Sequence, residues 1–238
     1  MTFRHGKNTK VLVGNYDLSS YLNEASVSQS VETGDITTFT SSAKSYIVGL
    51  ADGTISMGGM FDGAANATDE VLSTFLGDSA GDVITIAPEG LAHSRRVKSA
   101  LTLATSYEIS SPVADVVSVS AEAQVTGGVG QGVSLRDLTS ATATGTGTAL
   151  DNSASSANGG AGVLHVTTNA HNANATFKVQ HSADNSTWAD LVTFTVVSTT
   201  VLTNERIAVT GTVNRYLRAS HTLAGTGGIT YHINFSRF

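Results

Sequence analysis

The sequence contains no cysteine, which excludes disulfide bonds, zinc–thiolate sites and cysteine nucleophiles. Only two of its 238 residues are proline, too few for a proline-rich linker or a collagen-like chain. No apolar run approaches the roughly 18 residues that a membrane-spanning helix needs, so no membrane partner is expected. Residues 1–7 are basic, but no apolar segment follows them, so no secretory signal is predicted. We therefore expect synthesis and retention in the cytoplasm unless the protein joins a particle.

Charged residues are scarce, at 13% of the chain. Gly, Ala, Ser, Thr and Val dominate, a composition typical of β-sheets with hydroxyl-rich faces, which another copy of the chain can cover at little desolvation cost. The net charge of −6 is uneven, because residues 1–134 hold 7 basic and 14 acidic side chains while residues 135–238 hold 6 and 5. An acidic first half argues against binding of this half to the phosphates of nucleic acid. Solubility is the simpler explanation of the charge taken alone.

Alternating apolar and polar residues predict strands in the first half. Residues 25–31 alternate with a period of two, and residues 95–109 and 113–125 form two long neighbouring strands. Residues 31–63 predict a strand, a long exposed loop and a hairpin that turns at Asp52-Gly53. A polar loop of that length is usually functional, or disordered until something binds it.

One helix is predicted, over residues 66–76. Thr68 is the expected N-cap, and Asp69 and Glu70 lie in the first turn, where the helix dipole favours acidic side chains. Apolar residues then recur at helical spacing until Gly77 ends the helix. A single short helix among many strands is expected to cover one side of a sandwich or barrel.

The glycine-rich residues 127–132 predict a flexible joint and a domain boundary. Their spacing partly resembles a dinucleotide-binding loop, but no helix or βαβ pattern follows, so the linker interpretation is preferred. We predict two domains, residues 1–132 and 140–238, joined by a linker at 133–139. The second contains six or more short strands at regular spacing, typical of a small β-sandwich. The predicted fold class is all-β, with an N-terminal β-sandwich or barrel carrying one short helix, and a small C-terminal β-sandwich.

No catalytic constellation, metal site or cofactor site is predicted, so the protein is not expected to be an enzyme. The seven histidines lack the spacing of a zinc motif, and a strand histidine on a wet sheet face is far more common than a metal ligand. Trp188 and Tyr216 are a candidate aromatic platform for sugars, although the preferred interpretation is that Trp188 fills the sandwich core. The histidines are His5, His93, His165, His171, His181, His221 and His232.

The order of several motifs resembles a known family. The motifs are residues 35–39 (Asp-Ile-Thr-Thr-Phe), 44–46 (Lys-Ser-Tyr), 49–54 (Gly-Leu-Ala-Asp-Gly-Thr) and 56–63 (Ser-Met-Gly-Gly-Met-Phe-Asp-Gly), followed by the single helix and two long strands. Over roughly residues 8–126 the chain is similar to the tail tube, or major tail, proteins of long-tailed, non-contractile bacteriophages. Residues 179–188 and 215–218 resemble a small immunoglobulin-like or galactose-binding-like β-sandwich often appended to phage structural proteins.

The resemblance implies a self-assembling structural protein of the virion, made in the cytoplasm of the host bacterium. Six copies would form a ring whose sheets join into one inner barrel, and stacked rings would form a hollow tube through which DNA passes. Other implied partners are the tape measure, tail tip and terminator proteins, and the C-terminal domain would decorate the outside. The N-terminal arm, residues 1–9, would contact the adjacent ring, as would a ring-stacking loop. The expected loop residues are Gly34, Asp35, Thr37, Thr38, Phe39, Ser41 and Lys44.

Two other function classes remain open. The first is a non-enzymatic binding module of two β-sandwiches that recognises host-surface glycans, for which the absence of a secretory signal is unfavourable. The second is a hydrolase, which the sequence supports only weakly because no nucleophile–base pair stands out.

Overall fold

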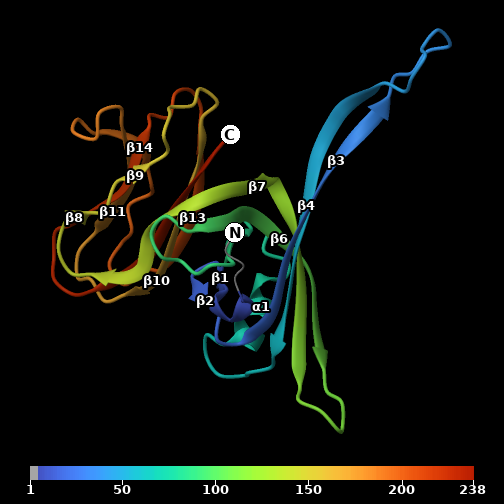
Figure 1. Ribbon diagram of the computed structural model, residues 1–238. Helices are drawn as coiled ribbons and strands as arrows, with labels where there is room; N and C mark the ends of the chain where they lie inside the picture. The colour runs from blue at the N-terminus through green and yellow to red at the C-terminus, as the bar shows by residue number, and fades with distance from the viewer. Residues whose placement is uncertain (1–4) are drawn as a thin grey trace.

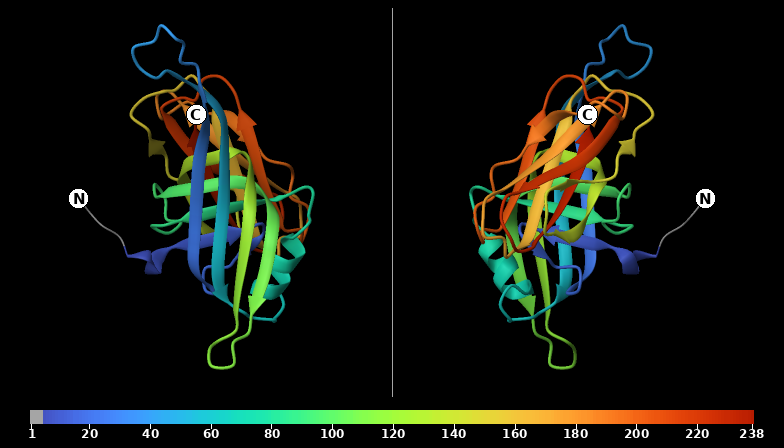
Figure 2. Two further views of the ribbon diagram at one scale, coloured as in Figure 1. Left: turned by 90° about the vertical axis from the view of Figure 1, so that its right-hand side faces the viewer. Right: turned by 90° about the vertical axis from the view of Figure 1, so that its left-hand side faces the viewer.

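The computed structural model describes residues 5–238 and has the predicted all-β fold with one α-helix (Figures 1 and 2). The strands form two antiparallel sheets, one of ten strands and one of five. The larger sheet follows the order β13 (Thr203–Val209), β10 (Gly160–Asn169), β15 (Ile229–Arg237), β7 (Ser118–Ala141), β6 (Arg96–Ser110), β5 (Asp82–Ala87), β1 (Lys10–Val13) and β2 (Tyr16–Asp17). Strands β3 (Leu22–Asp35) and β4 (Tyr46–Met60) join it through β7.

The C-terminal half is a β-sandwich. Its outer layer is the smaller sheet, which packs against β10, β13 and β15 (Figure 1). The core between these layers includes Phe177, Phe194 and Tyr231, and the ring centroids of Phe177 and Tyr231 lie 4.4 Å apart. The predicted small sandwich is therefore confirmed as an architecture. The smaller sheet contains β12 (Ala189–Thr193), β11 (Ala175–Ser182), β14 (Tyr216–Leu223), β8 (Gly145–Thr146) and β9 (Leu150–Asp151).

Strand β7 connects the two halves and corrects the expected linker. Residues 133–139 lie inside this strand, paired with β15, so they are not a flexible connection. Glycine is frequent just before them because β15 packs closely there: a Cβ at Gly130 or Gly132 would lie only 2.5 or 2.6 Å from the hydroxyl oxygen of Ser236. Gly130 and Gly132 thus serve close packing of strands, whereas Gly127 and Gly128 have positive φ, which glycine adopts readily. The division into domains 1–132 and 140–238 stays a prediction.

Helix α1 (Thr68–Phe75) covers one face of the sheet formed by β3, β4, β6 and β7. Val71, Leu72 and Phe75 are buried against this sheet, and burial of each stabilises the fold by roughly 1.5–3 kcal/mol. The predicted N-cap is wrong, since Ala67 occupies that position and Thr68 is the first helical residue. The Thr68 hydroxyl instead donates to the Met60 carbonyl at 2.8 Å, which ties the helix to the end of β4.

Strands β3 and β4 form one long hairpin, and no turn occurs at Asp52-Gly53. Both residues lie inside β4, paired with Ser30 and Gln29 of β3. The Asp52 carboxylate accepts a hydrogen bond from the Gly53 amide at 2.7 Å and another from the Gln124 side chain. Gln124 lies on the neighbouring strand β7, so pairing between strands holds Asp52 in an extended conformation. The chain turns instead at residues 36–45, where a long exposed loop was predicted. Of the predicted N-terminal arm, residues 1–4 lie outside the described residues, and Gly6–Asn8 form a 3-10 turn, η1.

Candidate assembly surfaces

Four strands form a sheet, here called the open sheet, with two unpaired edges. Its order is β3, β4, residues 118–124 of β7 and residues 103–110 of β6, with each neighbour antiparallel. In the described chain, β3 pairs only with β4, and beyond a single bridge to Ala104 this part of β6 pairs only with β7. Both outer strands therefore present free backbone N–H and C=O groups, which are templates for pairing with another chain.

The face of the open sheet turned away from α1 is polar and acidic. Nothing lies in front of this face in the left view of Figure 2, where the four strands run side by side. Because side chains alternate along a strand, the apolar residues face α1 and the polar residues face outward. A shallow hollow of about 370 Å³ lies on this acidic face, and no described residue lining it is basic. Its polar lining residues are Glu24, Glu108, Glu122, Ser56, Ser106 and Ser120.

Beyond the body of the protein, residues 31–50 form a protruding arm. All of these residues are exposed, and Figure 1 shows the arm extending beyond the rest of the protein. The arm nevertheless carries large apolar side chains, which is unusual for a surface that stays in water. A two-stranded hairpin alone is only marginally stable. Its exposed apolar residues are Val31, Ile36, Phe39, Tyr46, Ile47, Val48 and Leu50.

The seven residues predicted for ring stacking all lie at the end of this arm. Gly34 and Asp35 end β3, and Thr37, Thr38, Phe39, Ser41 and Lys44 lie in the following loop. Hydrogen bonds order the loop, since the Thr37 amide donates to Asp35 at 2.8 Å and the Ser45 amide donates to the Thr37 hydroxyl at 3.0 Å. The hydrogen bonds from Thr37 lower the pKa of Asp35. The Phe39 side chain is fully exposed at the tip. Sequence reasoning found this loop but missed the apolar strands that carry it.

Trp188 and Tyr216 both lie on the outer surface of the smaller sheet, and each contacts an arginine. The Arg218 guanidinium lies over the Trp188 ring, 4.1 Å from its centroid, and that of Arg215 lies 5.0 Å from the Tyr216 centroid. Trp188 is half-buried and lies outside the sandwich core, so the expectation that it fills the core is wrong. Two hydrogen bonds from Arg215, at 2.6 and 2.7 Å, lower the pKa of Asp151 to about 2.

The expectation that strand histidines lie on a wet sheet face is wrong for His165, His221 and His232, which are buried. The stacked rings of His165 and His232 lie between the two halves of the protein, with centroids 6.3 Å apart. The His221 Nε2 donates to the Ala143 carbonyl at 2.9 Å, so Nδ1 of the neutral ring accepts a 2.7 Å hydrogen bond from the Tyr231 hydroxyl. Within residues 5–238, no three His, Asp or Glu side chains gather in a way that would hold a metal ion. No helix in the same range is long and apolar enough to cross a membrane.

Comparison with known proteins gives matches among solved structures alone. No protein-family model and no curated protein sequence matches this chain. A chain from the virion of a native gene transfer agent particle is 19% identical, with a TM-score of 0.43, and the match covers 53% of this chain and 97% of that one. A chain from the tail of an empty gene transfer agent particle, refined with C6 symmetry, is 18% identical, with a TM-score of 0.43, covering 54% and 98%. The SPP1 Dit protein, a hub of the adsorption apparatus of phages that infect Gram-positive bacteria, is 13% identical, with a TM-score of 0.38, covering 96% and 98%.

Proposed function

We propose that this chain is a non-enzymatic structural subunit of a bacteriophage tail tube. The observation that carries the proposal is the open sheet with its two free edges. Strands β3 and β6 at these edges run antiparallel to each other, so the β6 edge of one copy pairs with the β3 edge of the next as an ordinary antiparallel ladder. Repeated head-to-tail pairing closes into a ring when a whole number of equal rotations, one between each pair of neighbouring copies, adds up to a full turn. Closure also removes the two exposed edges.

The number of copies and the particle come from the sequence resemblance. Tail tube proteins of long-tailed phages form rings of six, so the ring proposed here has six copies and lies in the virion. Its other partners are the tape measure, tail tip and terminator proteins. The open sheets of six copies would form one continuous inner barrel, with α1 and the C-terminal sandwich outside it.

Charge supports placing the acidic face toward the lumen. This face presents Glu24, Glu108 and Glu122 around one hollow, with Asp52 nearby on the same side of the sheet. Phosphates of DNA in transit meet like charge on such a wall, which prevents adhesion without blocking passage. The opposite face is covered by α1 and apolar side chains, so it is unsuited to line a water-filled channel.

The arm supplies the axial contact between rings. It projects from one end of the open sheet, and the loop between β6 and β7 lies at the other end (Figure 2). An arm with exposed Phe39, Val48 and Leu50 gains stability only when a second surface covers these side chains. The adjacent ring is the partner that a stacked tube provides. Residues 34–44 at the tip are the proposed stacking loop.

Electron microscopy of the purified protein at increasing concentration tests the proposal. Negatively stained samples should contain six-fold rings at low concentration and hollow tubes at high concentration, with density outside the wall from the C-terminal sandwich. Separate particles at every concentration, from protein shown to be folded by circular dichroism, would contradict the tube function.

Glycan recognition by the C-terminal sandwich is the second candidate. The two aromatic rings of Trp188 and Tyr216 on one outer surface favour it, because sugars stack on such rings. A glycan array probed with the full chain should then show specific binding that Trp188→Ala abolishes. Binding unchanged in that variant, or no binding at all, would leave the sandwich with a decorating role alone.

A further inference from the structure

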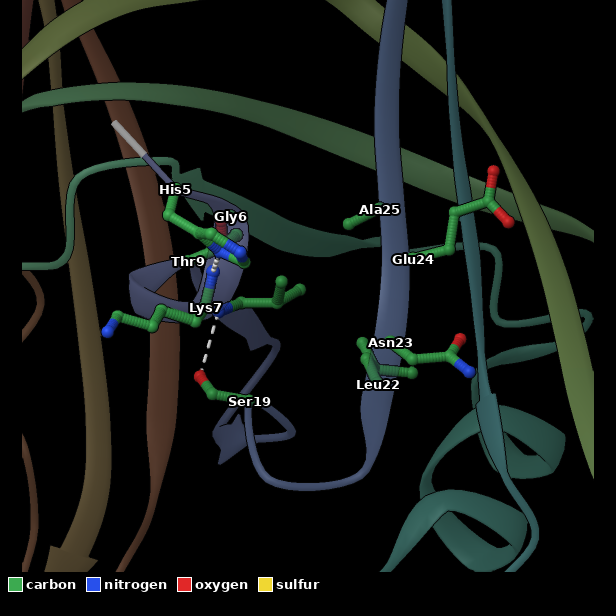
Figure 3. A pocket seen from close by; sticks show the side chains of 10 residues that line it. His5, Gly6, Lys7, Thr9, Ser19, Leu22, Asn23, Glu24 and Ala25 are labelled. Carbon is green, nitrogen blue, oxygen red and sulfur yellow. Dashed lines mark hydrogen bonds between the residues drawn. The ribbon is translucent and has the colours of Figure 1, made fainter. Parts of the chain in front are cut away.

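A groove of about 510 Å³ lies beside the free edge of β3 (Figure 3). One wall is η1 with the start of β1, and the other is the first part of β3. The Ala25 side chain points into the groove, whereas the Glu24 carboxylate points to the other side of the strand. This edge groove therefore lies on the α1 side of the open sheet. Val11, Leu22 and Ala25 supply its apolar lining, and Ser19, hydrogen-bonded to the Val11 amide at 2.9 Å, supplies a polar wall.

The opposite edge of the open sheet carries a matching set of exposed apolar side chains on the α1 side. Leu76 and Ile109 are each 45% exposed, although α1 and the strands around them pack into a closed core. Leu76 lies directly at the β6 edge, where it forms a parallel bridge with Ala104. These two residues are called the edge patch below. Neither the acidic face nor the arm accounts for them.

Ile109 lies at the level of the groove, and Leu76, bridged to Ala104, lies just beyond it, level with Val27. Leu22 pairs with Gly59, which pairs with Val119, which pairs with Ile109. Ala25 is likewise aligned through Met57 and Ala121 with Tyr107. Suppose that the β6 edge of one copy pairs with the β3 edge of the next. The edge patch, which lies beside β6 on the α1 side, must then enter the edge groove, which lies beside β3 on the same side.

Charge favours the same contact. Residues 5–9, on the groove wall, include His5 and Lys7 and no acidic residue. Residues 68–78, beside the edge patch, include Asp69, Glu70 and Asp78 and no basic residue. Opposite charge on two facing segments steers association and sets its register.

We propose that the edge groove of one copy receives the edge patch of a second copy, with Ile109 and Leu76 as the inserted side chains. This contact rests on the proposed ring and identifies the lateral interface that supports its β-ladder. Pairing of two strand edges leaves the flanking groove empty, and filling it with apolar side chains excludes water from the ladder. The groove is a specificity element, because only a copy presenting the patch on the α1 side fits it.

A cysteine pair tests the contact in a chain that has no cysteine of its own. Leu22→Cys and Ile109→Cys, combined in one chain, are aligned across the open sheet three strand spacings apart, roughly 14 Å, so they cannot form a disulfide within one copy. Mild oxidation of assembled protein should give a covalent ladder on a non-reducing gel, ending at the number of copies in the ring. Glu24→Cys with Ile109→Cys is the matched control, because the Glu24 side chain points to the acidic face and should give little ladder.

The outcomes separate this contact from the ring itself. A ladder from the Leu22 pair but not from the Glu24 pair supports the contact. Rings seen by microscopy with no ladder, or with equal ladders from both pairs, would overturn the contact and leave the ring function intact. Absence of rings from wild-type protein would overturn both. As a second measurement, Lys7→Glu should lower ring yield several-fold, and adding Glu70→Lys should restore it, while Lys7→Glu with yield unchanged counts against the contact.

Discussion

His165 on β10 and Thr85 on β5 meet in the buried interior, with 2.7 Å between the ring Nε2 and the threonine Oγ1. The other ring nitrogen, Nδ1, donates to the Gly14 carbonyl at 2.8 Å, because a carbonyl can only accept. In the neutral ring Nε2 is then the acceptor for the Thr85 hydroxyl. His232 is held in the same way, with Nδ1 donating to the Arg136 carbonyl at 2.7 Å. These bonds join strands of the two halves through two neutral imidazoles.

Acid should therefore weaken the fold. Burial lowers the pKa of His165 to about 4 and that of His232 to about 3, from 6.5 in the unfolded chain. Between the folded and unfolded pKa values of a histidine, the unfolded state binds more protons than the folded state. The contribution of each histidine to the free energy of unfolding is therefore at its maximum above about pH 6.5. It falls by about 1.4 kcal/mol per pH unit as the pH drops toward 4. Urea unfolding at several pH values measures this slope.

Two variants test whether these histidines cause the pH dependence of the free energy of unfolding. His165→Gln and His232→Gln should each reduce the loss of stability between pH 6.5 and 4, and the double variant should reduce it further. Stability that is level across this range in the wild-type protein would contradict the neutral, buried state of the two histidines.

Phe39→Ser should block growth of tubes without weakening the single chain. Phe39 is fully exposed in one copy, so its removal costs the monomer little, while a contact with the next ring loses a large apolar side chain. Electron microscopy should show rings but short or absent tubes, with an unchanged urea midpoint. Thr40→Ser in the same loop is the control and should give tubes of normal length. Full-length tubes from Phe39→Ser would remove the tip from the stacking contact.

Glu122→Lys should make tubes hold DNA. The substitution places a cation on the acidic face, which is the proposed lumen wall, and phosphates then bind in a salt-dependent way. Short labelled DNA incubated with open-ended tubes should become protected from nuclease in the variant and not in the wild type. A variant with Ala183→Lys and Ser186→Lys makes the same change of net charge on the exposed turn before β12. DNA bound there should stay digestible, and equal protection in both variants would place the acidic face outside the lumen.

Arg218→Ala should expose the ring of Trp188, the only tryptophan in the chain. The guanidinium covers one face of the indole, and such a pair contributes about 0.5–1 kcal/mol at an exposed site. Loss of the cover should shift the fluorescence emission to longer wavelength and increase quenching by acrylamide. Arg215→Ala, which removes the arginine over Tyr216, should leave tryptophan emission unchanged. An emission spectrum that is the same in wild type and Arg218→Ala would contradict the stacked arrangement.

Local patterns predicted much of the first half. Alternation of Ser with Val and Ala identified the strands around residues 25–31 and 117–125, and the structure places those residues on opposite faces of the open sheet. Apolar spacing likewise identified α1. Turn chemistry was less reliable: Asp52-Gly53 has the composition of a hairpin turn, but the Gln124 side chain and the pairing with β3 hold it in a strand. The glycines at 127–132 resembled a linker because the sequence does not show that β15 packs against Gly130 and Gly132.

The sequence by itself determined the fold class, the helix, the exposed loop at residues 36–45 and the acidic balance of the first half, because each depends on residues close together in the chain. Tertiary structure alone decided which strand edges stay free, that Glu24, Glu108 and Glu122 gather on one face, and that the two halves share β7 and a buried pair of histidines. Glu24 and Glu122 are 98 positions apart in the chain, and His165 and His232 are 67 positions apart. Such contacts depend on strand order and register, and strand order is set by the packing of the whole chain rather than by any local pattern.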